Sequence, residues 1–172
     1  MDNLPIEGAK IFDVDAYHDE RGAIFTTFDE NILRSCGVEF KRDKFNTNKR
    51  RVLRGIHWDD DTTKLVTCVY GDIEQVIVDM RPHSKTFMNH LKFNIGCRNR
   101  KAILIPPGVG NGFCVLSAVA IYHYKLAYPE AYIDAPLQRT IAWNSPDLGI
   151  EWQCDAPILS NRDNLTLGAK ID

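Results

Sequence analysis

Residues 64–80 read Lys-Leu-Val-Thr-Cys-Val-Tyr-Gly-Asp-Ile-Glu-Gln-Val-Ile-Val-Asp-Met. Two runs rich in β-branched residues flank Gly71-Asp72, a dipeptide typical of two-residue turns between paired strands. The stretch therefore predicts strands over residues 64–70 and 73–80 that pair as a hairpin.

The rest of the chain continues this pattern of short strands. A single helix is indicated in the first half, where Asp29 can cap a short helix that Gly37 ends. Residues 1–17 are predicted to form an extended arm that ends in a strand, and residues 109–112 a glycine-rich bend. Further strands are expected over residues 23–28, 88–95, 101–105, 113–116, 120–128 and 140–143. Many short strands with little helix indicate an all-β antiparallel sandwich or barrel.

Length and charge narrow the class of function. The 172 residues suit a single domain, and a net charge of -2 argues against a nucleic-acid binder. Hydrophobic residues make up 44% of the chain and charged residues 26%, as in ordinary globular proteins. A basic cluster from Lys41 to Arg54 is local, which favours a small anionic ligand.

The cysteines and the start of the chain indicate the compartment. Five cysteines are widely spaced without a Cys-x-x-Cys motif, which argues against a disulfide framework or a zinc site. Cys68 and Cys114 lie in apolar runs, where free thiols pack as small hydrophobic groups. No signal peptide or apolar run of 18 residues is seen. These features predict a cytoplasmic protein without membrane contact.

The main candidate for chemistry is residues 52–58, Val-Leu-Arg-Gly-Ile-His-Trp. His57 is the side-chain type that most often moves protons near neutral pH, although a histidine can equally pack or cap in a barrel. Strand alternation would put Arg54 and His57 on opposite faces, so a shared site requires either a bulge at Gly55 or an Arg54 side chain that reaches around the sheet edge. No His-x-His pair is present, and residues 59–61 are interpreted as a solvated turn, so no metal is predicted.

Three further residues carry no signal of their own. Tyr124 lies on an alternating face with Tyr122, where a row of tyrosines is usually core. Lys64 opens a strand, and Asp163 lies near the C-terminus, so both would be assigned to the surface on sequence pattern alone.

The chain resembles the family of dTDP-4-dehydrorhamnose 3,5-epimerase, the deoxysugar nucleotide epimerases. Matching segments occur in the family's order over nearly the whole chain: residues 19–22, 52–57, 64–71, 78–81, 105–108, 112–113, 124–125, 143–146 and 158–163. The resemblance implies a metal-free, cupin-like antiparallel jelly-roll barrel with short helices. It also implies a single epimerase domain over residues 1–172 that forms a homodimer by exchanging the arm of residues 1–17.

The resemblance also assigns roles to residues, and the assigned reaction needs no cofactor. His57 matches the base, Asp163 the carboxylate that orients it, Tyr124 the acid on the opposite face of the sugar ring, and Lys64 the cation that stabilises the enolate. Substrate contacts are expected from a second set: Arg21, Arg54, Asn111 and Tyr132.

Departures from the family pattern bear on the substrate. Asn111 stands where the family usually has histidine, and residues 128–139 form a longer segment than usual. These features are similar to the branch that acts on GDP-4-keto-6-deoxy-heptoses for bacterial capsules, which predicts epimerisation at C3, with or without C5. The alternatives are a dTDP-4-dehydrorhamnose 3,5-epimerase, a sugar-nucleotide 3,4-ketoisomerase and a catalytically silent sugar-nucleotide-binding barrel.

Overall fold

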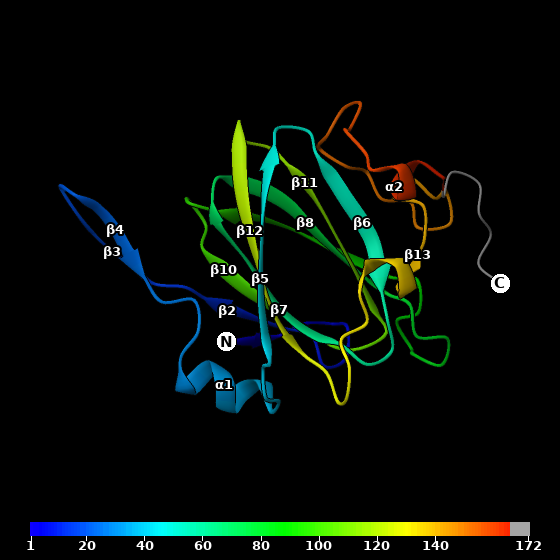
Figure 1. Ribbon diagram of the computed structural model, residues 1–172, viewed down its shortest axis with the longest axis horizontal. Coiled ribbons are helices and arrows are strands. Elements are labelled where there is room, and N and C mark those ends of the chain that lie inside the picture. The colour runs from blue at the N-terminus through cyan, green and yellow to red at the C-terminus, as the bar shows by residue number, and fades with distance from the viewer. Residues whose placement is uncertain (166–172) are drawn as a thin grey trace.

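The computed structural model describes residues 1–165, which form two antiparallel sheets and a separate hairpin (Figure 1). The six-stranded sheet has the order β1 (Asp2–Asn3), β2 (Lys10–Asp13), β10 (Lys101–Ile105), β7 (Thr63–Tyr70), β12 (Val119–Ala127) and β5 (Arg42–Lys49). The five-stranded sheet has the order β13 (Arg139–Thr140), β6 (Leu53–Trp58), β11 (Val109–Val115), β8 (Asp72–Asp79) and β9 (His90–Gly96). β3 (Ala16–Asp19) pairs with β4 (Gly22–Phe25).

The main core lies between the two sheets. Val66 and Ile103 of the six-stranded sheet share one buried cluster with Ile73, Ile77 and Phe113 of the five-stranded sheet. Each sheet turns its apolar face inward, as expected for a sandwich or barrel of antiparallel strands. The prediction of an all-β fold is confirmed.

The hairpin predicted at Gly71-Asp72 is wrong. β7 pairs with β10 and β12, whereas β8 pairs with β9 and β11, so the chain passes from one sheet to the other at Gly71. Gly71 has φ +78°, and a Cβ there would lie 2.1 Å from the carbonyl oxygen of Val119. Close packing against the start of β12 requires this glycine. The same sequence signal suits a hairpin turn and a crossing between sheets.

The glycine-rich bend predicted for residues 109–112 is also wrong, because these residues belong to the buried strand β11. A Cβ at Gly110 or Gly112 would lie 2.5 or 2.7 Å from the side chain of Ile56 on β6. The glycines therefore let β6 and β11 pack closely beneath the candidate site.

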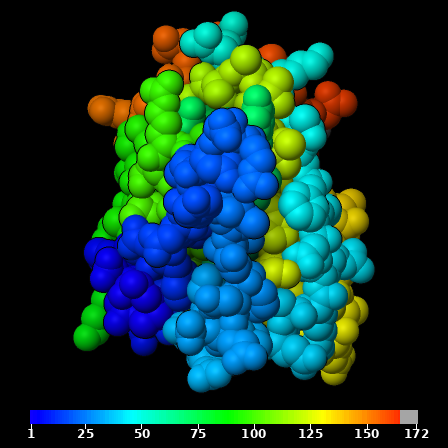
Figure 2. Space-filling model, turned by 90° about the vertical axis from the view of Figure 1, so that its left-hand side faces the viewer, coloured from blue at the N-terminus to red at the C-terminus, as the bar shows by residue number. Residues whose placement is uncertain are grey.

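The N-terminal region matches the prediction in part. α1 (Glu30–Cys36) is capped by Asp29, whose carboxylate accepts from the backbone N–H of Asn31 and Ile32, and Gly37 ends it with φ 67°. Residues 1–17 were predicted to form an extended arm, but β1 and β2 within this range pair in the six-stranded sheet. The segment that projects is the β3–β4 hairpin, which stands in front of that sheet in Figure 2.

The cysteine prediction needs one correction. Cys114 of β11 and Cys154 form a disulfide, so Cys114 is not a free thiol. The pair lies 40 residues apart in the sequence. Only the packing of the segment around Trp152 onto β6 and β11 brings the two together, so no local motif reveals it. Cys36, Cys68 and Cys97 are free.

Within residues 1–165, no helix is long and apolar enough to span a bilayer.

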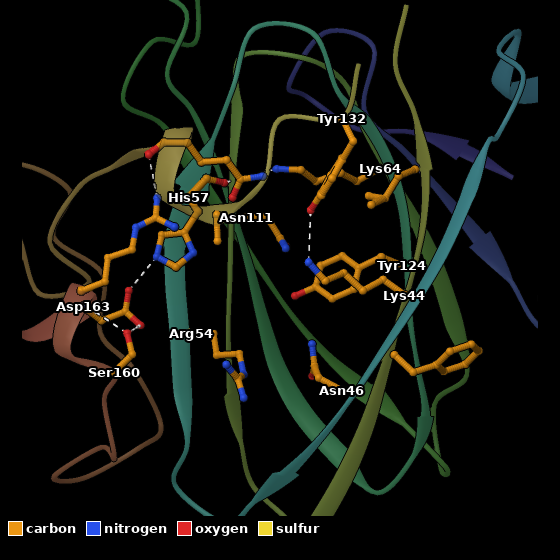
Figure 3. A pocket seen from close by; sticks show the side chains of 15 residues that line it. Lys44, Asn46, Arg54, His57, Lys64, Asn111, Tyr124, Tyr132, Ser160 and Asp163 are labelled. Carbon is orange, nitrogen blue, oxygen red and sulfur yellow. Dashed lines mark hydrogen bonds and ion pairs between the residues drawn. The ribbon is translucent and has the colours of Figure 1, made fainter. Parts of the chain in front are cut away.

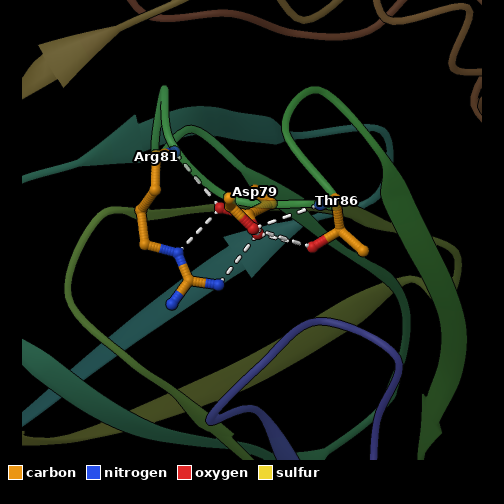
Figure 4. Close-up of polar contacts among 4 residues, drawn as sticks. Asp79, Arg81 and Thr86 are labelled. Atoms are coloured by element: carbon orange, nitrogen blue, oxygen red, sulfur yellow. Dashed lines mark hydrogen bonds and ion pairs between the residues drawn. The ribbon is translucent and has the colours of Figure 1, made fainter.

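One buried carboxylate holds the loop between β8 and β9 (Figure 4). Asp79 is fully buried and accepts two hydrogen bonds of 2.8 Å from the Arg81 guanidinium. It also accepts from the hydroxyls of Ser84 and Thr86 at 2.6 and 2.7 Å. Burial opposes the charge, but these hydrogen bonds outweigh it and lower the pKa of Asp79.

Asp79→Asn should lower the free energy of unfolding by about 3 kcal/mol at pH 7, because a buried ion pair loses one partner. The lowered pKa means that the carboxylate stabilises the fold fully above the ordinary aspartate pKa of 3.8. This contribution shrinks below pH 3.8 and is lost as the pH falls through the lowered pKa of the folded state. Urea unfolding at pH 7 and pH 3 measures both effects. The exposed ion pair of Asp13 with Lys101 supplies the control, and Asp13→Asn should have a far smaller effect. Equal effects of the two variants would contradict this account.

Candidate active site

The candidate site is a cavity of about 410 Å³ between β5, β6, β7, β11 and β12 (Figure 3). The segment around residues 132–138 and the helix α2 (Asn161–Leu165) complete its wall. Its lining contains seven of the eight predicted site residues: His57, Lys64, Tyr124, Asp163, Arg54, Asn111 and Tyr132.

A bulge in β6 brings Arg54 and His57 to one site. His57 lies opposite Asn111 on β11, but Arg54 lies opposite Phe113, so three steps on β6 match two on β11. Gly55, within the bulge, has φ +129°, and a Cβ there would lie 2.5 Å from the Cα of Gly112. The extra residue reverses the alternation, so both side chains line the cavity. Of the two arrangements that the sequence left open, the structure shows the bulge at Gly55.

His57 is paired with a buried carboxylate. Its Nε2 lies 2.6 Å from Oδ1 of Asp163, which is only 1% exposed. The hydroxyl of Ser160 donates to the other oxygen of Asp163 at 2.8 Å. Since Nε2–H donates to the carboxylate, the lone pair of neutral His57 is on Nδ1, which becomes the proton acceptor.

Lys64 places a buried cation beside His57. It is 5% exposed, and its Nζ donates to the backbone carbonyl of His57 at 3.4 Å. Desolvation lowers the pKa of Lys64 from 10.5 to about 8, although the charge of Asp59 acts in the opposite direction. Asp59 is itself buried and accepts from the backbone N–H of Thr62 at 2.6 Å, so the interpretation of residues 59–61 as a solvated turn is wrong for Asp59.

Tyr124 faces His57 across the cavity (Figure 3). Alternation along β12 puts it on the side of Tyr122 and Leu126, as predicted. Burial raises the pKa of Tyr124 to about 12, so the phenol keeps its proton at neutral pH. A base and a protonated acid therefore lie on opposite sides of one cavity.

Arg21 is the predicted site residue that lies elsewhere in this chain. It is at the turn of the β3–β4 hairpin, where its guanidinium pairs with Asp19 at 2.5 Å. Its side chain is 86% exposed. Within one chain, Arg21 therefore does not line the candidate cavity.

The cavity also contains residues that sequence analysis did not assign. They are Lys44, Phe45, Asn46, Leu126, Ala135, Gln138, Ser160 and Arg162. The basic cluster of residues 41–54 pointed to the region of Lys44, but Asn46 and Gln138 gave no signal. Tyr132 accepts from Nζ of Lys44 at 3.3 Å, and the guanidinium of Arg42 lies 4.6 Å from its ring.

The charges of the lining favour an anion. Four cations, Lys44, Arg54, Lys64 and Arg162, line the cavity together with one carboxylate, Asp163. Among residues 1–165, no three His, Cys, Asp or Glu side chains group in a way that could hold a metal ion. The arrangement can bind an anionic ligand and move protons on its two sides.

Comparisons with known proteins agree with this chemistry. A model of the family described as dTDP-4-dehydrorhamnose 3,5-epimerase matches residues 3–169. The dTDP-4-dehydrorhamnose 3,5-epimerase of Methanothermobacter thermautotrophicus is 35% identical over 168 residues, which cover 92% of this chain and 88% of that protein.

Two solved structures are similar over most of the chain. The dTDP-6-deoxy-D-glucose-3,5-epimerase of Legionella pneumophila, in complex with dTDP-4-keto-L-rhamnose, has a TM-score of 0.86 at 30% identity and covers 95% of this chain and 89% of its own. A 3'-monoepimerase of Streptomyces bikiniensis, in complex with dTDP-quinovose, has a TM-score of 0.86 at 28% identity and covers 96% and 86%. The cupin-like jelly-roll prediction is confirmed at the level of the fold.

Proposed function

This chain belongs to the dTDP-4-dehydrorhamnose 3,5-epimerase family, and from that premise we propose that it inverts a carbon next to the ketone of a dTDP-4-keto-6-deoxy sugar without a cofactor. It is an isomerase that acts on nucleotide-diphospho-4-keto sugars. The observation that carries the proposal is the convergence of the His57–Asp163 pair, Lys64 and Tyr124 on one cavity.

The proposed reaction moves two protons. The 4-keto group makes the hydrogen at C3 acidic, and Nδ1 of His57 accepts that proton while Asp163 supports the imidazolium. The electron pair of the broken C–H bond moves onto the ketone oxygen, where the cation of Lys64 stabilises the enolate. Tyr124 then donates its proton to the opposite face of C3. Exchange with water returns a proton to Tyr124 and removes one from His57.

For the nucleotide, the comparisons favour the dTDP alternative over the predicted GDP-heptose. The relatives and the two solved structures are named for dTDP sugars, and none of them for GDP-heptose. The role in capsule synthesis is likewise unsupported. Lys44 and Arg54 would bind the diphosphate, and Tyr132 offers an aromatic surface for the base.

A competition between substrates tests the nucleotide. We expect kcat/KM for a dTDP-4-keto-6-deoxy hexose to exceed that for the GDP-linked 4-keto-6-deoxy heptose, measured by proton NMR of the products. The same spectra separate inversion at C3 alone from inversion at C3 and C5, which the names of the relatives leave open. If only the GDP-linked sugar were converted, the substrate would be the GDP-heptose that the sequence predicted.

Tyr124→Phe should reduce formation of the inverted product by about 10²- to 10³-fold, because the proton donor on the second face is lost. His57 can still abstract and return a proton on its own face, so substrate should still incorporate deuterium from heavy water. Mass spectrometry of recovered substrate and product measures both. The control is Tyr128→Phe, since Tyr128 lies outside the cavity against Lys41. Normal inversion by Tyr124→Phe would remove Tyr124 from this role.

The projecting hairpin supports the predicted dimer. Tyr17 and Ile24 are a cross-strand pair on the hairpin with 68% and 72% of their surfaces exposed. Exposed apolar side chains on a projecting element are typical of an interface. We therefore propose that the exchanged element is the hairpin of residues 16–25 and not residues 1–17. Exchange of this hairpin would carry Arg21 toward a partner. Sedimentation of the native protein should give the mass of two chains.

A further inference from the structure

A buried polar chain runs beneath the cavity floor and ends at Asn111. Its members, Gln75 on β8 and Tyr122 on β12, are both 0% exposed, and neither lines the cavity. A polar side chain buried between two sheets costs stability unless it is hydrogen-bonded, so its partners reveal what it holds in place.

Backbone carbonyls fix the orientation of Gln75. Its amide nitrogen Nε2 lies 2.9 Å from the carbonyl oxygens of both Val76 and Gly112. Carbonyl oxygens only accept hydrogen bonds, so the atom facing them must be the NH2 group. The opposite atom, Oε1, then accepts from the hydroxyl of Tyr122.

Gln75 in turn fixes the orientation of Asn111. The same NH2 group lies 2.7 Å from Oδ1 of Asn111, and the Tyr122 hydroxyl lies 3.3 Å from that oxygen. The reverse orientation of Asn111 would put two NH2 groups against each other. Asn111 must therefore direct its oxygen inward and leave its own NH2 group to the cavity that it lines.

The position of Asn111 relates this amide to the reaction. Asn111 lies directly opposite His57 in the pairing of β11 with β6, and in the view of Figure 3 it lies between His57 and Tyr124. Opposed side chains on neighbouring antiparallel strands have Cβ atoms about 4.5–5.5 Å apart. Lys64, whose Nζ contacts the carbonyl of His57, is the second donor beside the base.

We propose that Gln75 and Tyr122 are positioning residues that lock Asn111 as a donor-only group, which hydrogen-bonds the substrate oxygen on which the enolate charge develops. This inference rests on the proposed function for the identity of that oxygen, but the orientation of Asn111 does not depend on it. A neutral donor that cannot titrate keeps the same hydrogen-bonding character at every pH at which the fold is intact. Asn111 and Lys64 would both donate hydrogen bonds to the enolate oxygen. The site therefore prefers a ketone oxygen, which only accepts, over a hydroxyl group, whose proton needs an acceptor.

The test compares two single substitutions at adjacent buried positions of β8. One replaces an amide by a carboxyl group, and the other replaces a carboxyl group by an amide. In Gln75→Glu the carboxylate can only accept, so Asn111 should turn its NH2 group inward and present an acceptor to the substrate. We expect kcat to fall about 10²-fold with a much smaller change in KM, as for loss of one donor to a developing oxyanion. The control is Glu74→Gln. Glu74 is equally buried but faces Lys92 and Gln153, so its loss should change stability and leave kcat within about 3-fold of the parent.

A second measurement needs no substrate and separates this inference from the proposed function. NMR follows the side-chain NH2 signal of Asn111, identified by its absence in Asn111→Asp. In the parent protein this NH2 group should exchange rapidly with water, because it faces the cavity. In Gln75→Glu it should be protected, because it bonds a buried carboxylate. A protected signal in the parent, or unchanged kcat and exchange in Gln75→Glu, would overturn the proposal. An inactive parent with the expected exchange pattern would instead refute the proposed function alone.

Discussion

His57→Asn should lower kcat by about 10³- to 10⁴-fold, because the cavity loses its proton acceptor. Asparagine retains a polar side chain that can hydrogen-bond Asp163, so the fold should persist, but it has no basic nitrogen. Incorporation of deuterium at C3 should fall by the same factor as product formation, since both require abstraction of the proton. This shared loss distinguishes His57→Asn from Tyr124→Phe, in which exchange continues.

The chain supplies a matched control for this result. His123 also lies 2.6 Å from a carboxylate, that of Asp43, and is 6% exposed, but it lies on the other face of β12. His123 does not line the cavity, although its ring stacks on that of Phe45, which does. His123→Asn should therefore lower kcat far less than His57→Asn. Equal losses in the two variants would mean that kcat reports the integrity of the fold rather than proton transfer.

Lys64→Met should lower kcat by about 10²- to 10³-fold while making the protein more stable. The enolate loses the cation that offsets its charge, which accounts for the loss of activity. Burial of the charged amine lowers its pKa from 10.5 to about 8, so the charge costs stability at neutral pH. Its removal should raise the free energy of unfolding at pH 7 by roughly 1–3 kcal/mol. That gain should shrink between pH 8 and 10.5, as the unfolded chain also loses its proton.

The same pKa predicts a pH dependence of activity. Lys64 is charged below about pH 8 and neutral above it, so kcat/KM of the parent should fall as the pH rises through that value. In Lys64→Arg the cation remains charged, and this fall should move to higher pH. Lys125→Met is the control, because Lys125 pairs with Asp43 on the opposite face of β12. Full activity of Lys64→Met, or a fall near pH 8 that persists in Lys64→Arg, would contradict the assignment.

Local patterns predicted the elements of the fold better than their pairing. The strand of residues 101–105 and the capped helix after Asp29 have their predicted positions, because side-chain alternation and capping are local properties. The prediction of a hairpin at Gly71-Asp72 was wrong because β7 and β8 pair with strands that lie far away in the sequence. The bend predicted from the glycines of β11 was wrong for a related reason, because these glycines allow close contact with Ile56 and do not form a turn.

The candidate site depended on both kinds of information. His57 could be identified from its residue type and neighbours. The conflict with strand alternation indicated a bulge at Gly55 as one of two possibilities, and the structure shows the bulge. Lys64, Tyr124 and Asp163 gave no local signal and were found only through the family resemblance. Gln75 gave no signal at all, because its role depends on contacts with β11 and β12 that the sequence does not display.

The most direct test of the account is incubation of the parent protein with dTDP-4-keto-6-deoxy hexose in heavy water, read by mass spectrometry and proton NMR. The account predicts an inverted product with solvent deuterium at C3, with a second deuterium at C5 if both centres invert. Binding of the sugar nucleotide without any deuterium incorporation would contradict proton abstraction by His57 and indicate a catalytically silent binding protein. Deuterium incorporation with a carbonyl moved to C3 would indicate a ketoisomerase instead.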